Sequence, residues 1–238
     1  MNVHSYLERR REREANAPKT RELCLQCLQP SFGCYCNHVR PFDPRIKFMI
    51  LIHPIEVKRR IATGRMSHLC LEGSTLVRGE DYSQSREVND VLEDPNFHSV
   101  MLYPGRDAVD LTAIAPETRS LLLPSEKKLA VFVIDGTWAT ARKMVRSENL
   151  ARLPRICFTP SRPSRFRVRK QPMEGCFSTI EAIHQTIELL GHAVDFPIES
   201  RLQDRLLDVF DVMVERQLKC IRELRTNRHA NYRRESRD

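Results

Sequence analysis

Long apolar runs are missing from this sequence. No segment approaches the ~18 consecutive apolar residues that a membrane-spanning helix requires. The first 20 residues carry many charges but no apolar core of a secretory signal. We therefore expect a soluble, cytoplasmic protein that has no membrane partner and no obligate protein partner.

Glycine is also scarce. The eight glycines are scattered, and neither the dinucleotide fingerprint G-x-G-x-x-G nor the P-loop pattern G-x-x-x-x-G-K-[ST] occurs. Their absence argues against a standard dinucleotide site and against a P-loop. Any cofactor must then be held by the backbone and side chains of several strand-end loops.

Acidic residues are outnumbered by basic ones. The 238 residues include 39 Lys and Arg against 31 Asp and Glu, which gives a net charge of +8 and a pI of about 9.2. Such a balance suits an acidic partner, of which nucleic acid is the commonest. The alternative is that the charge serves solubility alone. The length suits one large domain or one domain plus a small appendage, and 41% hydrophobic residues are enough for a core.

Four of the eight cysteines cluster near the start, in the segment CLQCLQPSFGCYC. Cys24 and Cys27 form a C-x2-C pair, and Cys34 and Cys36 form a C-x-C pair across a short Pro/Gly loop. Two such thiolate pairs can close a tetrahedral site, so we predict a structural Zn2+ knuckle over residues 21–40. An iron–sulfur cluster and a reducible pair of disulfides are the alternatives.

Strands that alternate with helices predict an α/β domain with a mostly parallel sheet over residues 41–225. The apolar run at 46–52 is typical of a strand buried on both faces. Further strands are predicted at 74–80, 98–105, 129–135 and 155–160, and helices at 57–73, 138–147, 178–192 and 199–225. A basic segment, 1–20, precedes the knuckle, and the basic tail 226–238 is predicted to be disordered.

An aspartate and the chain's only tryptophan follow the predicted strand at 129–135. Ligands of parallel sheets bind outside the carboxyl ends of the strands, which is where Asp135 is expected. This carboxylate could carry chemistry, or it could only cap the following helix. Trp138 could stack on a nucleobase, or it could pack in the core.

A run of cations follows the last predicted strand. The segment SRPSRFRVRKQP contains Arg162, Arg165, Arg167, Arg169 and Lys170, interleaved with one phenylalanine. Such a run is most often a solvated face. Its place at the edge of the expected site favours contacts with RNA phosphates instead.

Several motifs together resemble the DTW-domain family. The segment DGTW at 135–138 matches the D-x-T-W signature, and HPIE, TGR, LYPG and CFSTIEA stand in the family's order behind a four-cysteine knuckle. The resemblance covers nearly the whole chain, from Cys24 to the final helix. It implies a knotted, methyltransferase-like (SPOUT-like) fold. It also implies an enzyme that transfers the 3-amino-3-carboxypropyl group of S-adenosyl-L-methionine to N3 of a tRNA uridine, giving acp3U and methylthioadenosine.

Under this resemblance Asp135 and Trp138 are the catalytic candidates. Alkylation at N3 requires removal of its proton, and a carboxylate that is partly desolvated beside a Trp ring is a better base than a solvated one. Asp135 alternatively pairs with the donor's ammonium group or holds the uridine.

The resemblance further implies a donor site at the strand ends. The candidates are Tyr103, Pro104, Gly105, Thr137, Ser178, Thr179 and Glu181. Two of them, Ser178 and Glu181, also fit the S-x-x-E capping box. A helix N-terminus at a strand end can bind a carboxylate, and the donor carries one.

Two other functions remain open. An RNA methyltransferase of knotted fold would use the same donor but transfer a methyl group. A non-catalytic RNA-binding module would need only the zinc knuckle and the basic surface. The strand-tip Asp135 favours an enzyme, because a binding module has no need of a carboxylate there.

Overall fold

Six strands form one fully parallel sheet in the order β2-β1-β5-β3-β6-β4. The computed structural model describes residues 8, 22–57, 59, 61–124, 126–168 and 176–235. The strands are β1 (Lys47–Ile52), β2 (Thr75–Arg78), β3 (Phe97–Leu102), β4 (Val109–Asp110), β5 (Lys128–Asp135) and β6 (Arg155–Cys157). The five predicted strands are confirmed. The additional β4 has two residues and no apolar run that could have predicted it.

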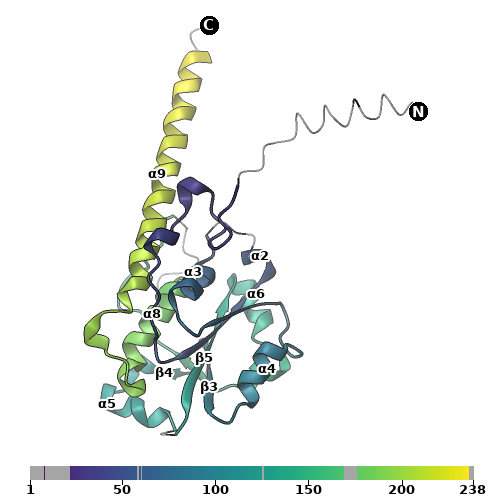
Figure 1. Cartoon of the computed structure of the whole chain (residues 1–238), viewed down its shortest axis with the longest axis vertical. Helices are drawn as coiled ribbons and strands as arrows, with labels where there is room; N and C mark the ends of the chain where they lie inside the picture. Colours follow the sequence, from purple (N-terminus) through teal and green to yellow (C-terminus); the bar gives the residue numbers. More distant parts are fainter. Residues whose placement is uncertain are drawn as a thin grey trace.

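Helices cover both faces of the sheet (Figure 1). On one face lie α3 (Thr63–Cys70), α8 (Thr179–Leu190) and α9 (Asp204–Glu235), and on the other α4 (Arg86–Glu93), α6 (Trp138–Met144) and α7 (Glu148–Ala151). The short helices are α2 (Pro54–Val57), α5 (Pro116–Arg119), η1 (Ser31–Gly33), η2 (Cys36–His38), η3 (Leu111–Ala113), η4 (Ser120–Leu122), η5 (Gly191–Val194) and η6 (Ile198–Ser200). Within the part of the chain that the structure describes, no helix combines the length and apolar character needed to cross a membrane.

Strand β1 contributes to two hydrophobic cores. Phe48 and Ile50 pack on the side of α3, α8 and α9, whereas Met49 and Leu51 pack on the side of α4 and α6. All four side chains are fully buried. A continuous apolar strand is therefore what this central position in a parallel sheet requires, as predicted for residues 46–52.

Two helix predictions need correction. The predicted helix at 57–73 is two helices, α2 and α3, because Ala62 is extended and α3 starts afresh at Thr63. The last helix begins at Asp204 rather than at 199, since Arg201 adopts a left-handed conformation with φ of 55°. It also continues to Glu235, and the disorder expected for the tail 226–238 stays a prediction. The tail contains no proline or glycine that would stop a helix.

The four-cysteine segment packs against α9 and not away from the domain. Cys27 and Tyr35 are buried within the same core cluster as α8 and α9. Arg216 of α9 donates to the carbonyl of Cys34, and its guanidinium lies 3.2 Å from Nε2 of His38. The four-cysteine segment thus packs against the α/β domain through α9 (Figure 1).

Candidate active site at the carboxyl edge of the sheet

Asp135 lies at a topological switch point of the sheet. Strands β1 and β5 are neighbours, with Ile52 paired to Asp135, and the N–H of His53 donates to the Asp135 carbonyl at 3.0 Å. From β1 the chain moves outward to β2, whereas from β5 it moves in the opposite direction, to β6. Ligands of open parallel sheets bind in the crevice that such a reversal leaves at the carboxyl edge.

The Asp135 carboxylate joins the starts of two helices. It is only 6% exposed. Its Oδ2 accepts from the backbone N–H of Gly64, in the first turn of α3, at 3.1 Å, and its Oδ1 accepts from the hydroxyl of Thr179, the first residue of α8, at 2.7 Å. Both helices direct the positive ends of their dipoles to this point, which favours the ionised form.

Gly64 is a site residue that the sequence did not single out. A Cβ added there would stand 2.4 Å from Oδ2 of Asp135, so only glycine allows this approach of α3 to the carboxylate. The same contact explains why α3 begins separately from α2, because a helix start leaves the Gly64 N–H without an intrahelical acceptor. In the sequence, only its place in the TGR motif could have pointed to Gly64.

The helix after β5 is capped by Thr137 and not by Asp135. Thr137 accepts from the N–H of Thr140 at 3.2 Å, so the alternative that Asp135 serves only as this cap is wrong. Gly136 is required for the turn, since a Cβ there would meet the Thr140 hydroxyl at 2.6 Å. The role of Thr137 in donor binding stays a prediction.

Trp138 lies on the surface beside the loop that follows β3. It is 40% exposed, and its ring centroid lies 6.4 Å from that of Tyr103. The guanidinium of Arg155 is 5.7 Å from the Tyr103 ring, and Pro104 and Gly105 continue the loop next to Arg155. The alternative that Trp138 packs in the core is therefore wrong. The contact between the two rings also brings the LYPG and DGTW motifs together in the fold.

Glu181 serves the architecture of the neighbouring loop. The capping box with Ser178 is present, with the Ser178 N–H and hydroxyl 2.9 and 2.6 Å from Oε2. Glu181 also accepts from the Ser164 hydroxyl and the Arg165 N–H, both at 2.7 Å. It is 4% exposed. These contacts make Glu181 a positioning residue that ties the loop after β6 to α8.

The predicted RNA-binding run is partly neutralised by α9. Arg165 forms an ion pair with Asp211 at 2.9 Å, and Arg167 pairs with Glu215. Arg162 is exposed in the same loop. The other two predicted residues, Arg169 and Lys170, lie outside the described residues.

Three other cations surround the aromatic pair. Burial raises the pKa of Tyr103, and the positive charges of Arg142, Arg155 and Arg146 act on it in the opposite direction. Sequence reasoning missed them because they are divided between α6, the turn after it and β6. The spacing of four between Arg142 and Arg146 was the available signal.

The four cysteine sulfurs converge as a metal site would require. The Sγ atoms of Cys24 and Cys36 are 3.6 Å apart, as are those of Cys27 and Cys34, and the set lies within 4.8 Å. Zn–S bonds of about 2.3 Å place tetrahedral sulfurs about 3.8 Å apart, so the geometry fits zinc. All eight cysteines are free, which excludes the disulfide alternative in this structure.

Backbone N–H groups favour the thiolate form of the first cysteine in this cluster. The backbone N–H groups of Cys27 and Gln26 lower the pKa of Cys24 to about 6. Burial raises the pKa of Cys27 and Cys36. A bound cation would overcome that burial cost, because metal binding favours the thiolate form.

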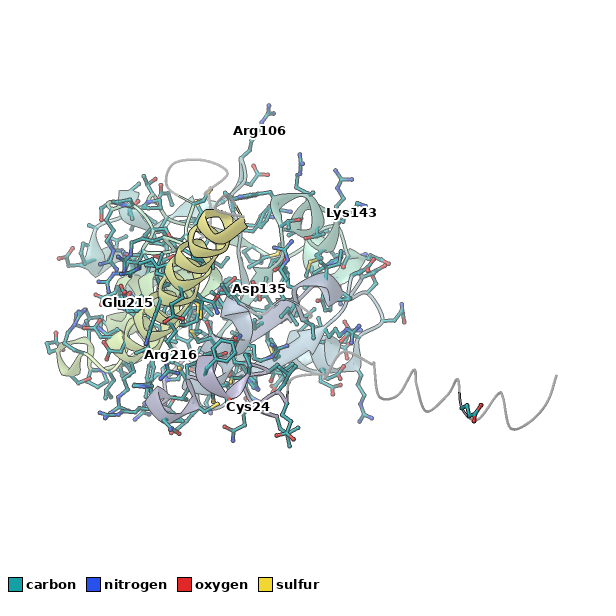
Figure 2. The ribbon with its side chains drawn as sticks, turned by 90° about the horizontal axis from the view of Figure 1, so that it is seen from above. Cys24, Arg106, Asp135, Lys143, Glu215 and Arg216 are labelled. Atoms are coloured by element: carbon teal, nitrogen blue, oxygen red, sulfur yellow. The ribbon has the colours of Figure 1, made fainter. Side chains whose placement is uncertain are left out.

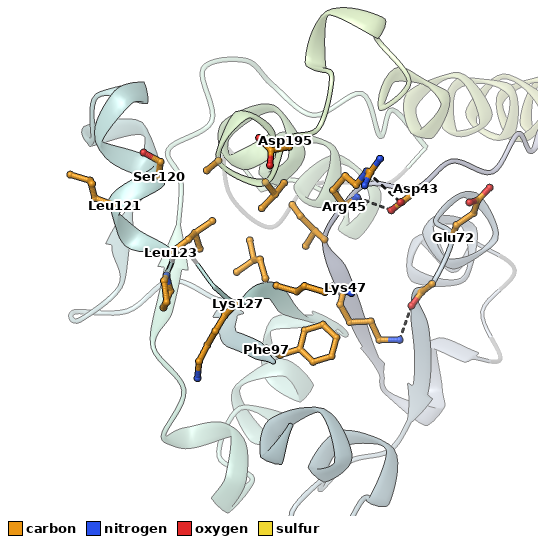
Figure 3. A pocket seen from close by; sticks show the side chains of 17 residues that line it. Asp43, Arg45, Lys47, Glu72, Phe97, Ser120, Leu121, Leu123, Lys127 and Asp195 are labelled. Atoms are coloured by element: carbon orange, nitrogen blue, oxygen red, sulfur yellow. Dashed lines mark hydrogen bonds and ion pairs between the residues drawn. The ribbon is translucent and has the colours of Figure 1, made fainter. Parts of the chain in front are cut away.

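A cavity of about 820 Å³ opens at the opposite, amino edge of the sheet (Figure 3). It is lined by Lys47, Phe97 and Lys128, at the starts of β1, β3 and β5, and by Leu121 and Asp195. The Lys47 amine donates to the Gly73 carbonyl and the Thr75 hydroxyl at 2.6 and 2.8 Å. No predicted site residue lines this cavity.

The fold and the site define an α/β domain with a candidate ligand site at a topological switch point. The DTW domain matches residues 21–218, and the chain therefore belongs to the DTW-domain family. Asp135 and Trp138 carry the first and last letters of that signature.

The chain is similar to tRNA-uridine aminocarboxypropyltransferases of animals and plants. It is 31% identical over 185 residues to tRNA-uridine aminocarboxypropyltransferase 2 of Drosophila melanogaster, which covers 74% of this chain and 69% of the relative. The mouse (Mus musculus) protein of that name is 29% identical over 172 residues, 70% of this chain and 56% of the relative. tRNA-uridine aminocarboxypropyltransferase A of Arabidopsis thaliana is 24% identical over 240 residues, 90% and 88%. No solved structure matches the chain.

Proposed function

We propose that the protein transfers the 3-amino-3-carboxypropyl group of S-adenosylmethionine to N3 of a tRNA uridine, in the cytoplasm. Membership of the DTW-domain family and the names of the relatives support this activity. The observation that carries it is Asp135, a buried carboxylate at the switch point with the exposed Trp138 three residues away. A module that only bound RNA would have no need of such a carboxylate.

The reaction forms one bond and breaks one. When bound, S-adenosylmethionine supplies the group as a carbon attached to a positively charged sulfur. The bond from uridine N3 to that carbon forms as the carbon–sulfur bond breaks, the electron pair stays with methylthioadenosine, and the N3 proton leaves. Asp135 either accepts this proton, or it binds the donor's ammonium group and the proton passes to water.

The neighbours of Asp135 are suited to both roles. The Gly64 N–H and the Thr179 hydroxyl hold its oxygens in one orientation, which a base and an ion-pair partner both require. The start of α8 offers backbone N–H groups near the donor's carboxylate, with Ser178 and Thr179 in the first positions. Pro104 and Gly105, with the adjoining Tyr103, would then border the adenosine part of the donor.

The four-cysteine cluster would hold a structural zinc ion. Its sulfurs, from Cys24, Cys27, Cys34 and Cys36, have the spacing of a tetrahedral site with no open position for a substrate. The ion would fix the segment against α9 and take no part in the transfer.

We infer that the chain path is knotted in the SPOUT-like manner. Membership of the DTW-domain family supports this inference, and strand β5 lies between β1 and β3, which both precede it in the chain. A crystal structure traced through residues 158–178 tests this inference. A path that leaves β6 and reaches α8 without passing through a loop would contradict it.

Mass spectrometry of nucleosides tests the proposed reaction. Unmodified tRNA transcripts are incubated with protein and S-adenosylmethionine labelled in its methyl group. We expect acp3U without label and labelled methylthioadenosine in equal amounts. Label in the RNA would indicate a methyltransferase, and tRNA binding with no product would indicate a binding module.

A further inference from the structure

Trp138 is placed to meet a ligand and not the protein core. It is one of the few exposed large hydrophobic side chains among the described residues, and it stands at the start of α6, three residues after Asp135. The Tyr103 ring flanks it at 6.4 Å, tilted by 54°. Two neighbouring rings at the mouth of a site offer stacking faces that accept any nucleobase.

Cations without carboxylate partners surround these rings. Arg142 and Arg146 are four residues apart and share one side of α6 and its final turn, and Arg155 lies over Tyr103. Within the described part of the chain, none of the three forms an ion pair. Figure 2 shows Arg106 and Lys143 projecting on the same side of Asp135, opposite Cys24. Positive charge is thus concentrated beside the aromatic pair.

The run at 162–168 differs in this respect. Arg165 and Arg167 already pair with Asp211 and Glu215 of α9. An RNA phosphate would have to compete with these carboxylates for both guanidinium groups. The cations around α6 require no such exchange, so they attract phosphate more strongly.

The chemistry of the substrate restricts the RNA. N3 of uridine takes part in base pairing, so it is accessible only where the base is unpaired. Proteins recognise unpaired RNA through aromatic stacking combined with phosphate contacts along the strand. The aromatic pair with its surrounding arginines offers both.

We propose that Tyr103, Trp138, Arg142, Arg146 and Arg155, here called the α6 surface, bind the unpaired tRNA strand that carries the target uridine. A base next to the target stacks on Trp138, and the flanking phosphates lie on Arg142 and Arg146. The target base can then reach Asp135. This inference rests on the proposed function and assigns its RNA-binding surface.

Salt-dependent tRNA binding tests the α6 surface, measured without donor on a pool of unmodified tRNA transcripts. Arg142→Ala with Arg146→Ala should weaken binding and reduce the slope of log affinity against log salt by about 0.7 to 0.9 per lost phosphate contact. The matched control is Lys127→Ala with Lys128→Ala, which removes the same charge at the amino edge. Equal losses in both variants, or no loss in the first, would overturn the proposal.

The aromatic contact has a different signature. Trp138→Leu should weaken tRNA binding by about tenfold without changing the salt slope, because stacking releases no counterions, and Trp138→Phe should retain most of the affinity. Unchanged binding by Trp138→Leu would contradict the stacking role.

Nucleoside analysis of the wild-type protein distinguishes a failure of the α6 surface from a failure of the proposed function. If acp3U forms while both α6 variants bind normally, the surface is wrong and the function stands. If acp3U does not form, the function is wrong.

Discussion

The two edges of the sheet differ in the groups that they offer to a ligand. At the carboxyl edge, two helix starts meet the buried carboxylate of Asp135, and Trp138 nearby is exposed. Arginines that form no ion pair within the described residues lie beside it. The amino edge holds a cavity of about 820 Å³, but the amine of Lys47 there is engaged by Gly73 and Thr75. A cavity alone therefore does not identify the candidate site.

The difference follows from the parallel arrangement of the strands. All strands end at the same edge, so the loops after them meet there. The helices that follow these loops therefore begin at the carboxyl edge. Backbone N–H groups at helix starts are unsatisfied and attract anions, as the Gly64 N–H does, and the Thr179 hydroxyl adds a side-chain donor at the start of α8. The amino edge has the other ends of these helices and lacks that attraction.

The largest expected effect concerns the zinc ion that we propose for the four-cysteine cluster. Cys24→Ser with Cys27→Ser should reduce zinc from about one ion per chain to none and unfold the segment at 22–40, because thiolate ligation is folding energy there. Metal analysis and hydrogen exchange measure both results. Cys157→Ser with Cys220→Ser, outside the cluster, is the control and should keep its zinc. Full zinc content in the Cys24→Ser, Cys27→Ser variant would contradict the proposal that the four cysteines bind the ion.

The next effect concerns the geometry around Asp135. Gly64→Ala places a methyl group 2.4 Å from Oδ2 and should displace the carboxylate, so we expect acp3U formation to fall by about tenfold or more. Affinity for tRNA should stay unchanged. Gly33→Ala is the control, since its Cβ would have its closest contact at 3.4 Å. A normal rate in Gly64→Ala would show that the carboxylate need not be held in this position.

The smallest effect concerns a charged cluster away from the carboxyl edge. Burial lowers the pKa of His184, against the opposing influence of Asp204 and Glu188. The folded pKa is therefore below the unfolded one, and the stabilisation is complete above about pH 6.5 and lost as pH falls through the folded pKa. Thermal unfolding should show a loss of stability on acidification that is smaller in His184→Gln. The exposed His192 serves as control, and His192→Gln should keep the wild-type pH dependence.

That cluster also illustrates why a grouping of ligand types is no metal site by itself. His184, Glu188 and Asp204 lie close enough to bind an ion. Arg201 already bridges Glu188 and Asp204, at 2.8 and 2.7 Å, and supplies the positive charge. The four cysteines have no such cation among them.

Local patterns sufficed for the strands and for Asp135. The apolar run of β5 predicts a buried strand, and parallel strands place its last residue at the carboxyl edge. The position of Trp138 at a helix start followed in the same way. Local patterns could not predict the two-residue strand β4 or the separate start of α3 at Thr63. Both depend on partners that are distant in the sequence.

The basic residues show the limit of sequence reasoning most clearly. Arg165 and Arg167 stand out as a run, yet Asp211 and Glu215, 46 and 48 positions later, neutralise them. Arg142, Arg146 and Arg155 do not form a run, and only the fold gathers them around Tyr103. Pairing across the chain, and not charge density along it, decides which cations remain available to RNA.

The central claim is that the Asp135 carboxylate performs the transfer at the carboxyl edge, and single-turnover formation of acp3U by Asp135→Asn tests it most directly. The asparagine can keep both contacts, since its carbonyl accepts from Gly64 and its amide donates to the Thr179 oxygen. We therefore expect an unchanged thermal midpoint and unchanged tRNA affinity, with a rate lower by about 10²-fold or more. Partial rescue at high pH would identify a base, and weaker donor binding without rescue would identify the ammonium partner. A normal rate with normal donor binding would contradict the account.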